Sequence, residues 1–428
     1  MFKNIENNKR LSIFNKEMLY QLNFKADKID CKVNLPLSKS ISNRLLIIRA
    51  LSDEKATSAG ISDSDDTRVL FRGLQSKSET VDVGHAGTSM RFLTAYFAAT
   101  AQKKIITGSA RMQERPIRDL VEALNQLGAD IRYLGKEGFP PVQTSDKKLS
   151  GNAVHINGNI SSQFITALLL IAPALPNGLA IHINGELVSK SYVKMTLALM
   201  LQAGVSAKID QQAITVAAQK YSAEGIECER DWSAASYWYE IAALSNDAHI
   251  QLTGITADSL QGDAVIARIF AQLGVETVFY SGGAYLRKGQ PQSPAHFEFD
   301  FINAPDIAQT VAVCLCMKNI PFRLTGLKTL RVKETDRIAA LQNELGKFGF
   351  PLKEPQAGVL EWDGERRSPQ KAIRIATYHD HRMAMAFAPT AIVFPEIGIE
   401  NPDVVSKSYP QFWEALEGAG CMITPKNG

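Results

Sequence analysis

Cysteine is scarce in this sequence of 428 residues, which contains only Cys31, Cys228, Cys314, Cys316 and Cys421. Their odd number and the absence of any CxxC pair argue against a disulfide framework and against a zinc site. We therefore expect the chain to work in a reducing compartment, the cytoplasm.

Long hydrophobic runs are also missing. The apolar run 164–175 is interrupted by Thr166 and Pro173, and it is too short to span a bilayer. The N-terminal stretch 1–25 is polar and has no apolar signal core, so export is not expected. The sequence predicts no membrane partner.

An excess of one charge sign is lacking as well. Lys and Arg together number 47 and Asp and Glu 44, which gives a net charge of +3. Such an even balance of positive and negative charges does not favour a broad nucleic-acid-binding surface. No phosphate-binding GxxxxGK[ST] loop occurs either. Any anion binding must come from basic residues concentrated at particular positions.

What the sequence does contain is a repeat. The composition, 45% hydrophobic and 21% charged, is that of a globular protein, and the length favours two domains. A junction in which a helix ends at Gly and a short apolar strand follows recurs about every 70 to 76 residues. The junctions lie at Gly128, Gly204, Gly274, Gly349 and Gly420, where we expect positive φ. Gly73 comes too soon to continue the series, so the first unit is expected to be shortened.

Basic residues stand at or near the starts of several predicted helices. They are Lys39, Arg44, Arg115, Lys333, Arg337, Arg382 and Lys407. Ordinary helices favour acidic residues there, because the helix dipole is positive at this end. A bound anion would satisfy both the basic side chains and the helix end. Repeated departures from a local rule are typical of functional sites, and here they predict a cleft for ligands with several negative groups.

Two helix starts can be placed more closely. In the segment Arg331 to Arg337 we expect the helix to begin near Lys333, one turn before Arg337 and next to Glu334. Farther upstream, Ser40 is expected to cap the helix that contains Arg44.

Some of these signatures also fit purely structural roles. The run Ser161, Ser162 and Gln163 suits either a helix cap or a phosphate site, and Asp306 suits a plain N-cap. His379 and His381 form a His-x-His pair with no further ligands close by in the sequence, so no metal is expected.

In order and spacing, the motifs together resemble the 5-enolpyruvylshikimate-3-phosphate synthase family of enolpyruvyl transferases, from Lys32 onward. The matching segments are Leu35 to Arg44, Ala86 to Arg91, Glu114 to Ile117, Ser161 to Gln163, Leu187 to Lys190, Leu260 to Asp263, Arg331 to Arg337 and Asp380 to Met385. The resemblance implies an α/β fold of two lobes, each with three repeated βαβαββ units whose helix N-termini face the cleft between them. It assigns residues 1–36 plus 231–428 to lobe 1, with the phosphoenolpyruvate and catalytic residues, and 37–230 to lobe 2, which binds shikimate 3-phosphate.

The implied reaction transfers the enolpyruvyl group of phosphoenolpyruvate to the 5-hydroxyl of shikimate 3-phosphate and releases phosphate through a tetrahedral intermediate. It belongs to chorismate and aromatic amino acid biosynthesis. By the resemblance, shikimate 3-phosphate would contact Lys39, Ser40, Arg44, Ser161, Ser162, Gln163, Ser189, Tyr192, Asp306, Thr329 and Lys333. Phosphoenolpyruvate would contact Lys39, Gly87, Arg115, Gln163, Arg337, Arg382 and Lys407. No cofactor is implied, and a monomer is expected.

Asp306, Glu334 and Lys39 would be catalytic, with Asp306 accepting a proton from the hydroxyl and Glu334 giving one to the methylene carbon. Glu334 presents a difficulty, because Lys333 and Arg337 beside it should lower its pKa and keep it ionised. A general acid must instead hold a proton. We expect the anionic substrates to neutralise these cations and lobe closure to remove water, which raises the pKa of Glu334.

The sequence departs from the family at three positions near the site. His85 and Thr329 stand where Asn is usual, and Phe92 stands where Pro is common. The segment between Arg68 and Gly84 is also shorter than in the family. These differences bear on substrate affinity and on the response to glyphosate, a family inhibitor that would overlap the phosphoenolpyruvate site.

Two alternative functions stay open at this point. A related enolpyruvyl transferase acts on UDP-N-acetylglucosamine, but it uses a reactive cysteine on a mobile loop, and no cysteine here lies in a matching motif. A non-catalytic anion-binding protein would fit His85, Thr329 and the shortened first unit. Retention of Asp306, Glu334 and Lys39 argues against it.

Overall fold

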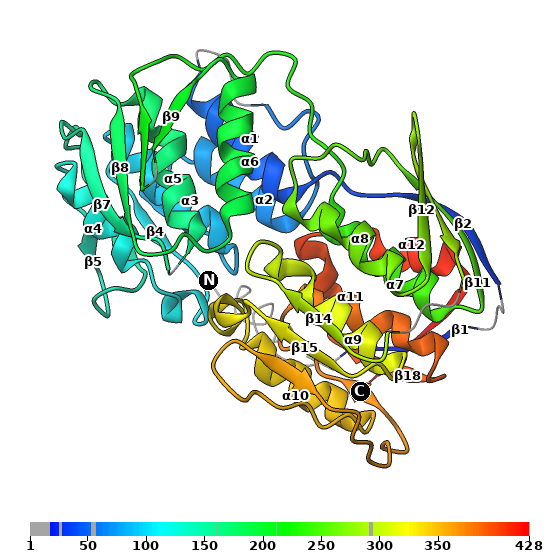
Figure 1. Cartoon of the computed structure of the whole chain (residues 1–428). Helices are drawn as coiled ribbons and strands as arrows, with labels where there is room; N and C mark the ends of the chain where they lie inside the picture. The colour runs from blue at the N-terminus through cyan, green and yellow to red at the C-terminus, as the bar shows by residue number, and fades with distance from the viewer. Residues whose placement is uncertain are drawn as a thin grey trace, which may run out of the picture.

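The computed structural model describes residues 18–24, 28–52, 57–159, 161–210, 212–290 and 294–427. Of the N-terminal stretch 1–25, only 18–24 is described, and it forms strand β1 (Met18–Phe24); the expectation for the remainder lies outside the described residues. The chain folds into two lobes that lie side by side (Figure 1). Within the described ranges, no helix combines the length and the apolar character that a membrane crossing requires.

Lobe 2 contains two sheets and the first six helices. Its helices are α1 (Lys39–Leu51), α2 (Asp65–Gln75), α3 (Gly87–Ala99), α4 (Arg118–Gln126), α5 (Ser162–Ile171) and α6 (Lys190–Gln202), with short 3-10 helices η1 (Met112–Glu114) and η2 (Ala172–Ala174). Its strands are β3 (Thr80–Asp82), β4 (Ile105–Thr107), β5 (Arg132–Tyr133), β6 (Val142–Gln143), β7 (Ala153–Asn157), β8 (Leu179–Asn184), β9 (Ala207–Asp210) and β10 (Ala213–Val216).

Lobe 1 contains three sheets. Its helices are α7 (Trp232–Leu244), α8 (Ile266–Ala271), α9 (Ala308–Met317), α10 (Arg337–Lys347), α11 (His381–Phe387) and α12 (Phe412–Gly418). The 3-10 helices are η3 (Gly262–Val265), η4 (Pro305–Ile307), η5 (Lys328–Val332), η6 (Ala388–Ile392) and η7 (Pro402–Lys407). Besides β1, its strands are β2 (Lys28–Asn34), β11 (Asp247–Thr253), β12 (Val275–Tyr280), β13 (Gly283–Lys288), β14 (Phe297–Asp300), β15 (Phe322–Thr325), β16 (Leu360–Trp362), β17 (Arg374–Ile375), β18 (Ile397–Glu400) and β19 (Cys421–Asn427).

The five sheets share one plan, which accounts for the sequence repeat. The strand orders are β3-β4-β6-β5, β7-β8-β10-β9, β2-β11-β13-β12, β14-β15-β16 and β17-β18-β1-β19. In each order the first two strands are parallel, and every later strand is antiparallel to its neighbour. The shortened first unit contributes α1 and α2, and in its described residues it has no sheet of its own.

All five junction glycines have positive φ, from +79° at Gly204 to +97° at Gly128, as the sequence predicts. A named strand follows four of them. The prediction of a strand after Gly349 is wrong, because in the described residues that segment forms only an isolated bridge between Lys353 and Glu361. The segment contains Pro351 and Pro355, and proline has no N–H to donate to a strand ladder.

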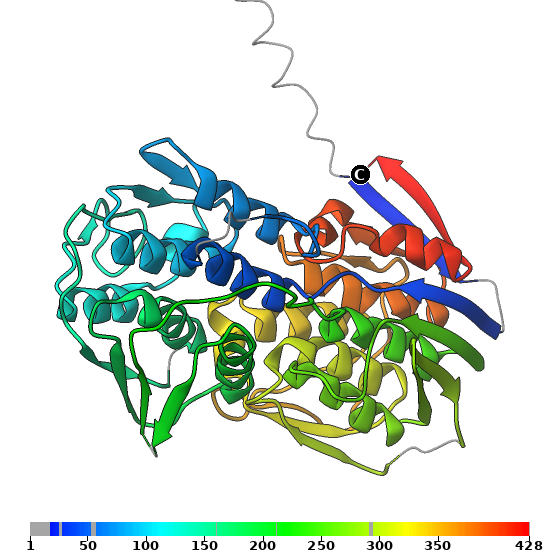
Figure 2. The same cartoon turned by 90° about the horizontal axis from the view of Figure 1, so that it is seen from above.

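Each lobe has its own hydrophobic core. Helix α9 in lobe 1 and helix α5 in lobe 2 are buried all round or nearly so, and their sequences are apolar on every face, as a central helix requires. Farther from the cleft, α4 packs on β7, α8 packs on β12, and α12 packs on β19, whereas α10 packs on α9 (Figures 1 and 2). The inner helices are thereby fixed with their N-terminal ends toward the cleft.

The chain passes between the lobes along two adjacent segments, which run side by side in Figure 2. Leu37 and Arg230 form an antiparallel bridge there. The backbone N–H of Asp231 donates to the carbonyl of Pro36 at 2.9 Å. The two crossings thus form a paired connection between the lobes.

The junction glycines allow a matched test of the fold. Gly349 has φ +85°, and an added Cβ would contact the Arg367 carbonyl, so Gly349→Ala should destabilise by about 1–2 kcal/mol or more. Gly346 lies inside α10 with nothing within 4 Å of an added Cβ. Gly346→Ala should therefore stabilise by about 0.5–1 kcal/mol. Urea unfolding of both variants measures the difference, and equal effects would contradict the structure.

Candidate active site

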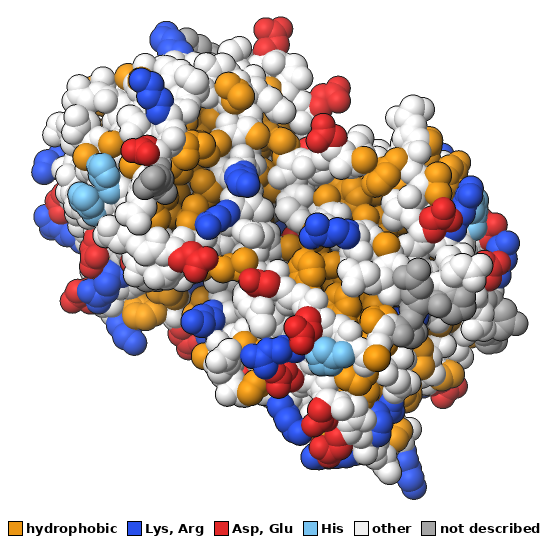
Figure 3. Space-filling view, viewed as in Figure 1, with side chains coloured by type: hydrophobic (Ala, Val, Ile, Leu, Met, Phe, Trp, Pro, Cys, Tyr) orange, Lys and Arg blue, Asp and Glu red, His pale blue; other side chains and the backbone are white. Residues whose placement is uncertain are grey.

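Basic and acidic side chains are interspersed on the outer face seen in Figure 3, in keeping with the small net charge of +3. The cleft between the lobes is different. It has a volume of about 1050 Å³ and is lined by more basic than acidic side chains. The basic ones are Lys39, Arg44, Arg91, Arg115, Lys333, Arg337 and Arg382, and the acidic ones are Asp66, Asp306 and Glu334. Such a lining suits ligands with several negative groups.

The structure brings the sequence-predicted residues together in this cleft. The lining contains Lys39, Ser40, Arg44, Gly87, Arg115, Ser161, Ser162, Gln163, Ser189, Tyr192, Asp306, Thr329, Lys333, Glu334, Arg337 and Arg382. Lys407 joins the group through an ion pair of 2.8 Å with Glu334. The residues come from both lobes and from helix starts far apart in the sequence.

Helix α1 places Lys39 and Arg44 at one side of the cleft. The expected cap at Ser40 is wrong: Ser38 is the N-cap, and its Oγ accepts from the N–H of Ile41 at 3.4 Å. Ser38 has the extended backbone that an N-cap requires, whereas Ser40 already lies inside the helix. Lys39 is consequently the first helical residue, and its Nζ forms an ion pair of 3.0 Å with Asp66.

Arg44 is buried without a carboxylate partner in the described part of the chain. Its Nε donates to Thr196 Oγ1 at 2.8 Å, and its guanidinium lies 5.8 Å from the ring centre of Tyr192. Burial lowers the pKa of Arg44 to about 10. A cation desolvated in this way gains from a bound anion, which supplies the missing charge partner.

A second pair of buried cations lies at the start of α3. An added Cβ at Gly87 would lie 2.7 Å from the Arg115 guanidinium carbon, so a side chain there would displace that guanidinium. Arg91, which sequence reasoning did not assign to the site, donates to the carbonyls of Gly87 and Pro116 at 3.0 and 2.8 Å. Burial, and after it the nearby Arg115, lower the pKa of Arg91 well below its usual value. Two guanidiniums beside a helix N-terminus are a setting that favours anions.

Uncharged donors come from two other helix starts in lobe 2. Ser161 caps α5, and its Oγ accepts from the N–H of Gln163 at 3.3 Å, as one of the two alternatives for this motif predicts. Ser189 precedes α6 in the left-handed conformation, with φ +55°. Its N–H donates to the carbonyl of Ile302 in lobe 1 at 3.0 Å, so this edge of the cleft is in contact across the lobes.

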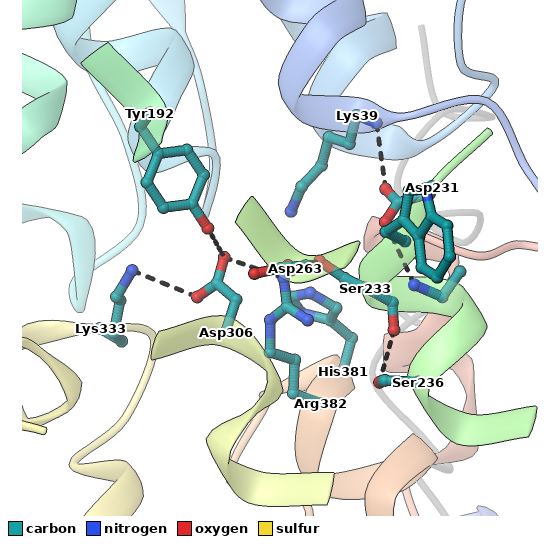
Figure 4. Close-up of polar contacts among 12 residues, drawn as sticks. Lys39, Tyr192, Asp231, Ser233, Ser236, Asp263, Asp306, Lys333, His381 and Arg382 are labelled. Atoms are coloured by element: carbon teal, nitrogen blue, oxygen red, sulfur yellow. Dashed lines mark hydrogen bonds and ion pairs between the residues drawn. The ribbon is translucent and has the colours of Figure 1, made fainter. Parts of the chain in front are cut away.

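Asp306 lies at the centre of the cleft in 3-10 helix η4 (Figure 4). Its carboxylate pairs with Arg382 at 2.9 Å, Arg337 at 3.2 Å and Lys333 at 3.4 Å, and it accepts from Tyr192 Oη at 2.9 Å. Burial by itself would raise the pKa of Asp306, but these cations outweigh it and hold the pKa well below its usual value. Asp306 is therefore ionised and able to accept a proton.

Glu334 occupies a similar setting and shares the partner Arg337 with Asp306. It pairs with Lys407 at 2.8 Å and with Arg337 at 3.1 Å. Burial again raises its pKa, and Lys407, Arg337 and Arg115 lower it further than burial raises it, so the carboxylate is ionised. The sequence correctly placed Arg337 beside it, but Lys333 turns toward Asp306 instead, and Lys407 takes its place.

The expected helix start near Lys333 is also wrong. Helix α10 begins at Arg337, and the side chain of Asp336 caps it by accepting from the N–H of Ala339 at 3.2 Å. Asp is a strong N-cap residue, and Lys333 has the extended backbone that ends η5. Lys333 and Glu334 therefore stand on a connecting segment outside the helix.

Arg337 joins the two carboxylates. Its side chain is 2% exposed and bonds to Asp306, to Glu334 and, at 2.7 Å and 3.3 Å, to Asp380. Asp380 is fully buried and also caps α11 by accepting from the N–H of Arg382 at 2.9 Å. In the sequence, Asp380 lies in one of the segments that match the family but has no predicted role; the signal is an acidic residue directly before a basic helix start.

Other groups near the site were also missed. Both ring nitrogens of His381 are buried in the cleft lining without a hydrogen-bond partner in the described chain, although Nδ1 lies 3.6 Å from Asp380 Oδ1, and burial lowers the pKa of His381 well below the usual value. Behind Arg382, the Ser233 hydroxyl donates to Asp263, and burial raises the pKa of Asp263 to about 7. The buried Oγ1 of Thr329, a residue that the sequence did assign to the site, has no hydrogen-bond partner in the described part of the chain. No sequence signal links these groups, because they meet only through the fold.

Comparison with known proteins agrees with this geometry. The model of the EPSP synthase (3-phosphoshikimate 1-carboxyvinyltransferase) family matches residues 72–416. A 3-phosphoshikimate 1-carboxyvinyltransferase of Bacteroides fragilis (strain YCH46) is 49% identical over 397 residues, 92% of this chain and 97% of its own. One of Shewanella halifaxensis (strain HAW-EB4) is 36% identical over 415 residues, 90% of this chain and 96% of its own. A solved EPSP synthase from Acinetobacter baumannii, 19% identical, has the same fold, with a TM-score of 0.72 over 96% of this chain and 100% of that one.

The lowered pKa of Glu334 makes a prediction about acid stability. The pKa of Glu334 is lower in the folded protein than in the unfolded chain, where it is about 4.3. The ionised carboxylate therefore stabilises the protein above about pH 4.3, and this stabilisation is lost as the pH falls toward the pKa of the folded state. Glu334→Gln should therefore flatten the decline of unfolding free energy below about pH 4.3. Glu365→Gln, at an exposed carboxylate, is the control and should leave the decline unchanged. An unaltered decline in Glu334→Gln would contradict the ion pairing.

Proposed function

The chain belongs to the EPSP synthase (3-phosphoshikimate 1-carboxyvinyltransferase) family, and on that premise we propose how its residues divide the reaction. The enzyme transfers the enolpyruvyl group of phosphoenolpyruvate to the 5-hydroxyl of shikimate 3-phosphate through a tetrahedral intermediate, and phosphate is released. This is a step of chorismate and aromatic amino acid biosynthesis.

The observation that carries the division of roles is the placement of two ionised carboxylates on either side of the Arg337 guanidinium. In our proposal Asp306 accepts the proton of the 5-hydroxyl, and Glu334 gives a proton to the methylene carbon. Lys39 lies between the substrates and serves both. Reaction within one cleft brings the two substrates together, which supplies much of the rate.

The electrostatics of the cleft support a change of pKa on substrate binding. Burial is the largest influence on both Asp306 and Glu334, and it raises their pKa values; only the paired cations reverse it. Substrate phosphates and carboxylates compete for Lys333, Arg382 and Lys407. As they take these cations, burial prevails, so Asp306 becomes a stronger base and Glu334 holds its proton.

The remaining residues divide by substrate. We assign shikimate 3-phosphate to Lys39, Ser40, Arg44, Ser161, Ser162, Gln163, Ser189, Tyr192, Asp306, Thr329 and Lys333. We assign phosphoenolpyruvate to Lys39, Gly87, Arg115, Gln163, Arg337, Arg382 and Lys407. The carboxylate-free guanidinium of Arg44 supports the first group, and the pair of Arg91 and Arg115 at Gly87 supports the second. Two substrates that are both anionic repel each other, so several fixed cations are needed to hold them together.

We further propose a cytoplasmic monomer whose lobes comprise residues 1–36 plus 231–428 and residues 37–230. The two separate hydrophobic cores support these boundaries, since one draws on Leu22 to Leu35 and Trp232 onward and the other on Ile41 to Ala223. The unpaired state of all five cysteines supports a reducing compartment.

The choice of acceptor can be tested directly. Phosphate release from phosphoenolpyruvate should require shikimate 3-phosphate, and UDP-N-acetylglucosamine should not replace it. The described cleft lining contains no cysteine, which a transferase acting on the nucleotide sugar would use. Turnover with the nucleotide sugar would favour that alternative, and no release with either acceptor would favour a binding protein.

The acid role of Glu334 has a kinetic test. Glu334→Gln should lower kcat by about 10²- to 10⁴-fold, the usual contribution of a general acid, with little change in the KM for shikimate 3-phosphate. Activity that depends on a protonated Glu334 falls as the pH rises, so the variant should also lose the alkaline limb of the kcat profile. Glu344→Gln, a buried carboxylate on α10 that pairs with Lys347, is the matched control. A pH–rate profile unchanged by Glu334→Gln rejects this role.

A further inference from the structure

Arg111 stands in lobe 2, on the loop between β4 and α4, yet its side chain reaches the other lobe. Its Nε donates to the backbone carbonyl of Glu334 at 3.2 Å. Its Nη2 donates to the backbone carbonyl of Lys333 at 3.3 Å. A single guanidinium thus binds two successive carbonyl groups across the cleft.

The segment that accepts these bonds has no regular structure of its own. Residues 333–336 lie between η5 and α10 and belong to neither. Lys333 turns toward Asp306, and Glu334 turns toward Lys407. The position of this backbone therefore sets two side chains with different tasks, and a small shift would misplace both.

The loop that carries Arg111 is firmly attached to lobe 2. Met112 is fully buried in its core, and the N–H of Ser109 donates to the carbonyl of Gly84 at 3.0 Å. The same loop continues to Arg115, whose guanidinium lies against Gly87. The loop therefore presents one arginine to the anion site in lobe 2 and another to the Lys333–Glu334 backbone in lobe 1.

We propose that Arg111 is a positioning residue for the reaction: it transmits the closed arrangement of the lobes to the backbone of Lys333 and Glu334. The contact exists only while the two lobes are together, because its donor and acceptors belong to different lobes. Arg111 touches neither reacting group in this assignment and acts through the two residues it holds. The inference rests on the roles proposed above for Lys333 and Glu334.

The other contact of Arg111 does not explain the arrangement. Its Nη1 pairs with Glu114 at 3.0 Å, but the two side chains are 38% and 66% exposed, and such surface pairs contribute little. The rigid fork of arginine suits two adjacent acceptors, whereas a lysine ammonium is a point charge. The chain therefore offers two informative comparisons, Glu114→Gln and Arg111→Lys.

The kinetic experiment compares Arg111→Met with these two variants in the full chain. Arg111→Met should lower kcat by about 10- to 100-fold, as expected for misplaced catalytic groups, with the KM for phosphoenolpyruvate within about twofold of wild type. Arg111→Lys should recover part of the loss, and Glu114→Gln should match wild type. In Arg111→Met, Glu334 should sit farther from its cations, which raises its pKa and moves the alkaline limb of kcat to higher pH.

Two kinetic results would overturn the proposal. The first is a kcat of Arg111→Met within about twofold of wild type, well short of the loss that misplaced groups cause. The second is a loss confined to the KM for phosphoenolpyruvate with an unmoved pH profile, which would mean that Arg111 only supports the Arg115 loop.

A measurement that does not depend on enzyme activity distinguishes failure of the positioning role from failure of the proposed function. Hydrogen–deuterium exchange of the peptide covering residues 331–337 should be faster in Arg111→Met than in wild type, and unchanged in Glu114→Gln. Equal exchange in wild type and Arg111→Met would overturn the positioning role even if the wild-type enzyme is active. Faster exchange in an enzyme that lacks the expected turnover would keep the positioning contact and reject the assigned reaction.

Discussion

The arrangement of the cleft depends on one buried guanidinium, that of Arg337, which bonds to three carboxylates at once. Asp380 is fully buried and fixes it from behind, so only Asp306 and Glu334 face the cleft. A buried cation with one fixed and two exchangeable partners can give up the latter to a ligand without becoming unpaired. In the proposed assignment, opposite ends of the Arg337 guanidinium therefore bond to the base and to the acid.

The other cations of the cleft have fewer ionic partners than Arg337. Within the described residues, Arg44 and Arg91 are desolvated and donate only to uncharged acceptors, which include the Met112 sulfur for Arg91, whereas Lys407 and Arg382 are paired with the carboxylates. Arg44 and Arg91 therefore have no anionic partner among the described residues. Lys407 and Arg382 must release a protein carboxylate before they can pair with an anionic group of a ligand. In the proposed assignment, binding of the substrates redistributes ion pairs that already exist, and it requires few new charges to be buried.

Much of this was accessible from the sequence, and what was not has a physical reason. The five junction glycines predicted the repeat, because a helix that ends in the left-handed conformation depends on local residues. The basic helix starts predicted the cleft. The predicted start of α10 was wrong, because Asp336 is the better cap. The predicted pairing of Glu334 with Lys333 was also wrong, because Lys407, from a distant segment, pairs with Glu334 instead. Asp66, Asp263 and His381 join the site only through tertiary contacts, which no spacing in the chain encodes.

The paired crossing between the lobes has a consequence for how the chain is synthesised. With the lobe boundaries proposed above, lobe 2 is a continuous insertion into lobe 1 whose two ends meet at the Leu37–Arg230 bridge, and it has been fully synthesised once residue 230 is added. Lobe 1 cannot finish then, because β1 at one terminus must pair with β19 at the other. Strands β1 and β2 belong to sheets whose other strands follow lobe 2 in the sequence, so these two strands have no partner strands while that lobe folds. We therefore expect chaperones to bind mainly the early strands of lobe 1 during translation.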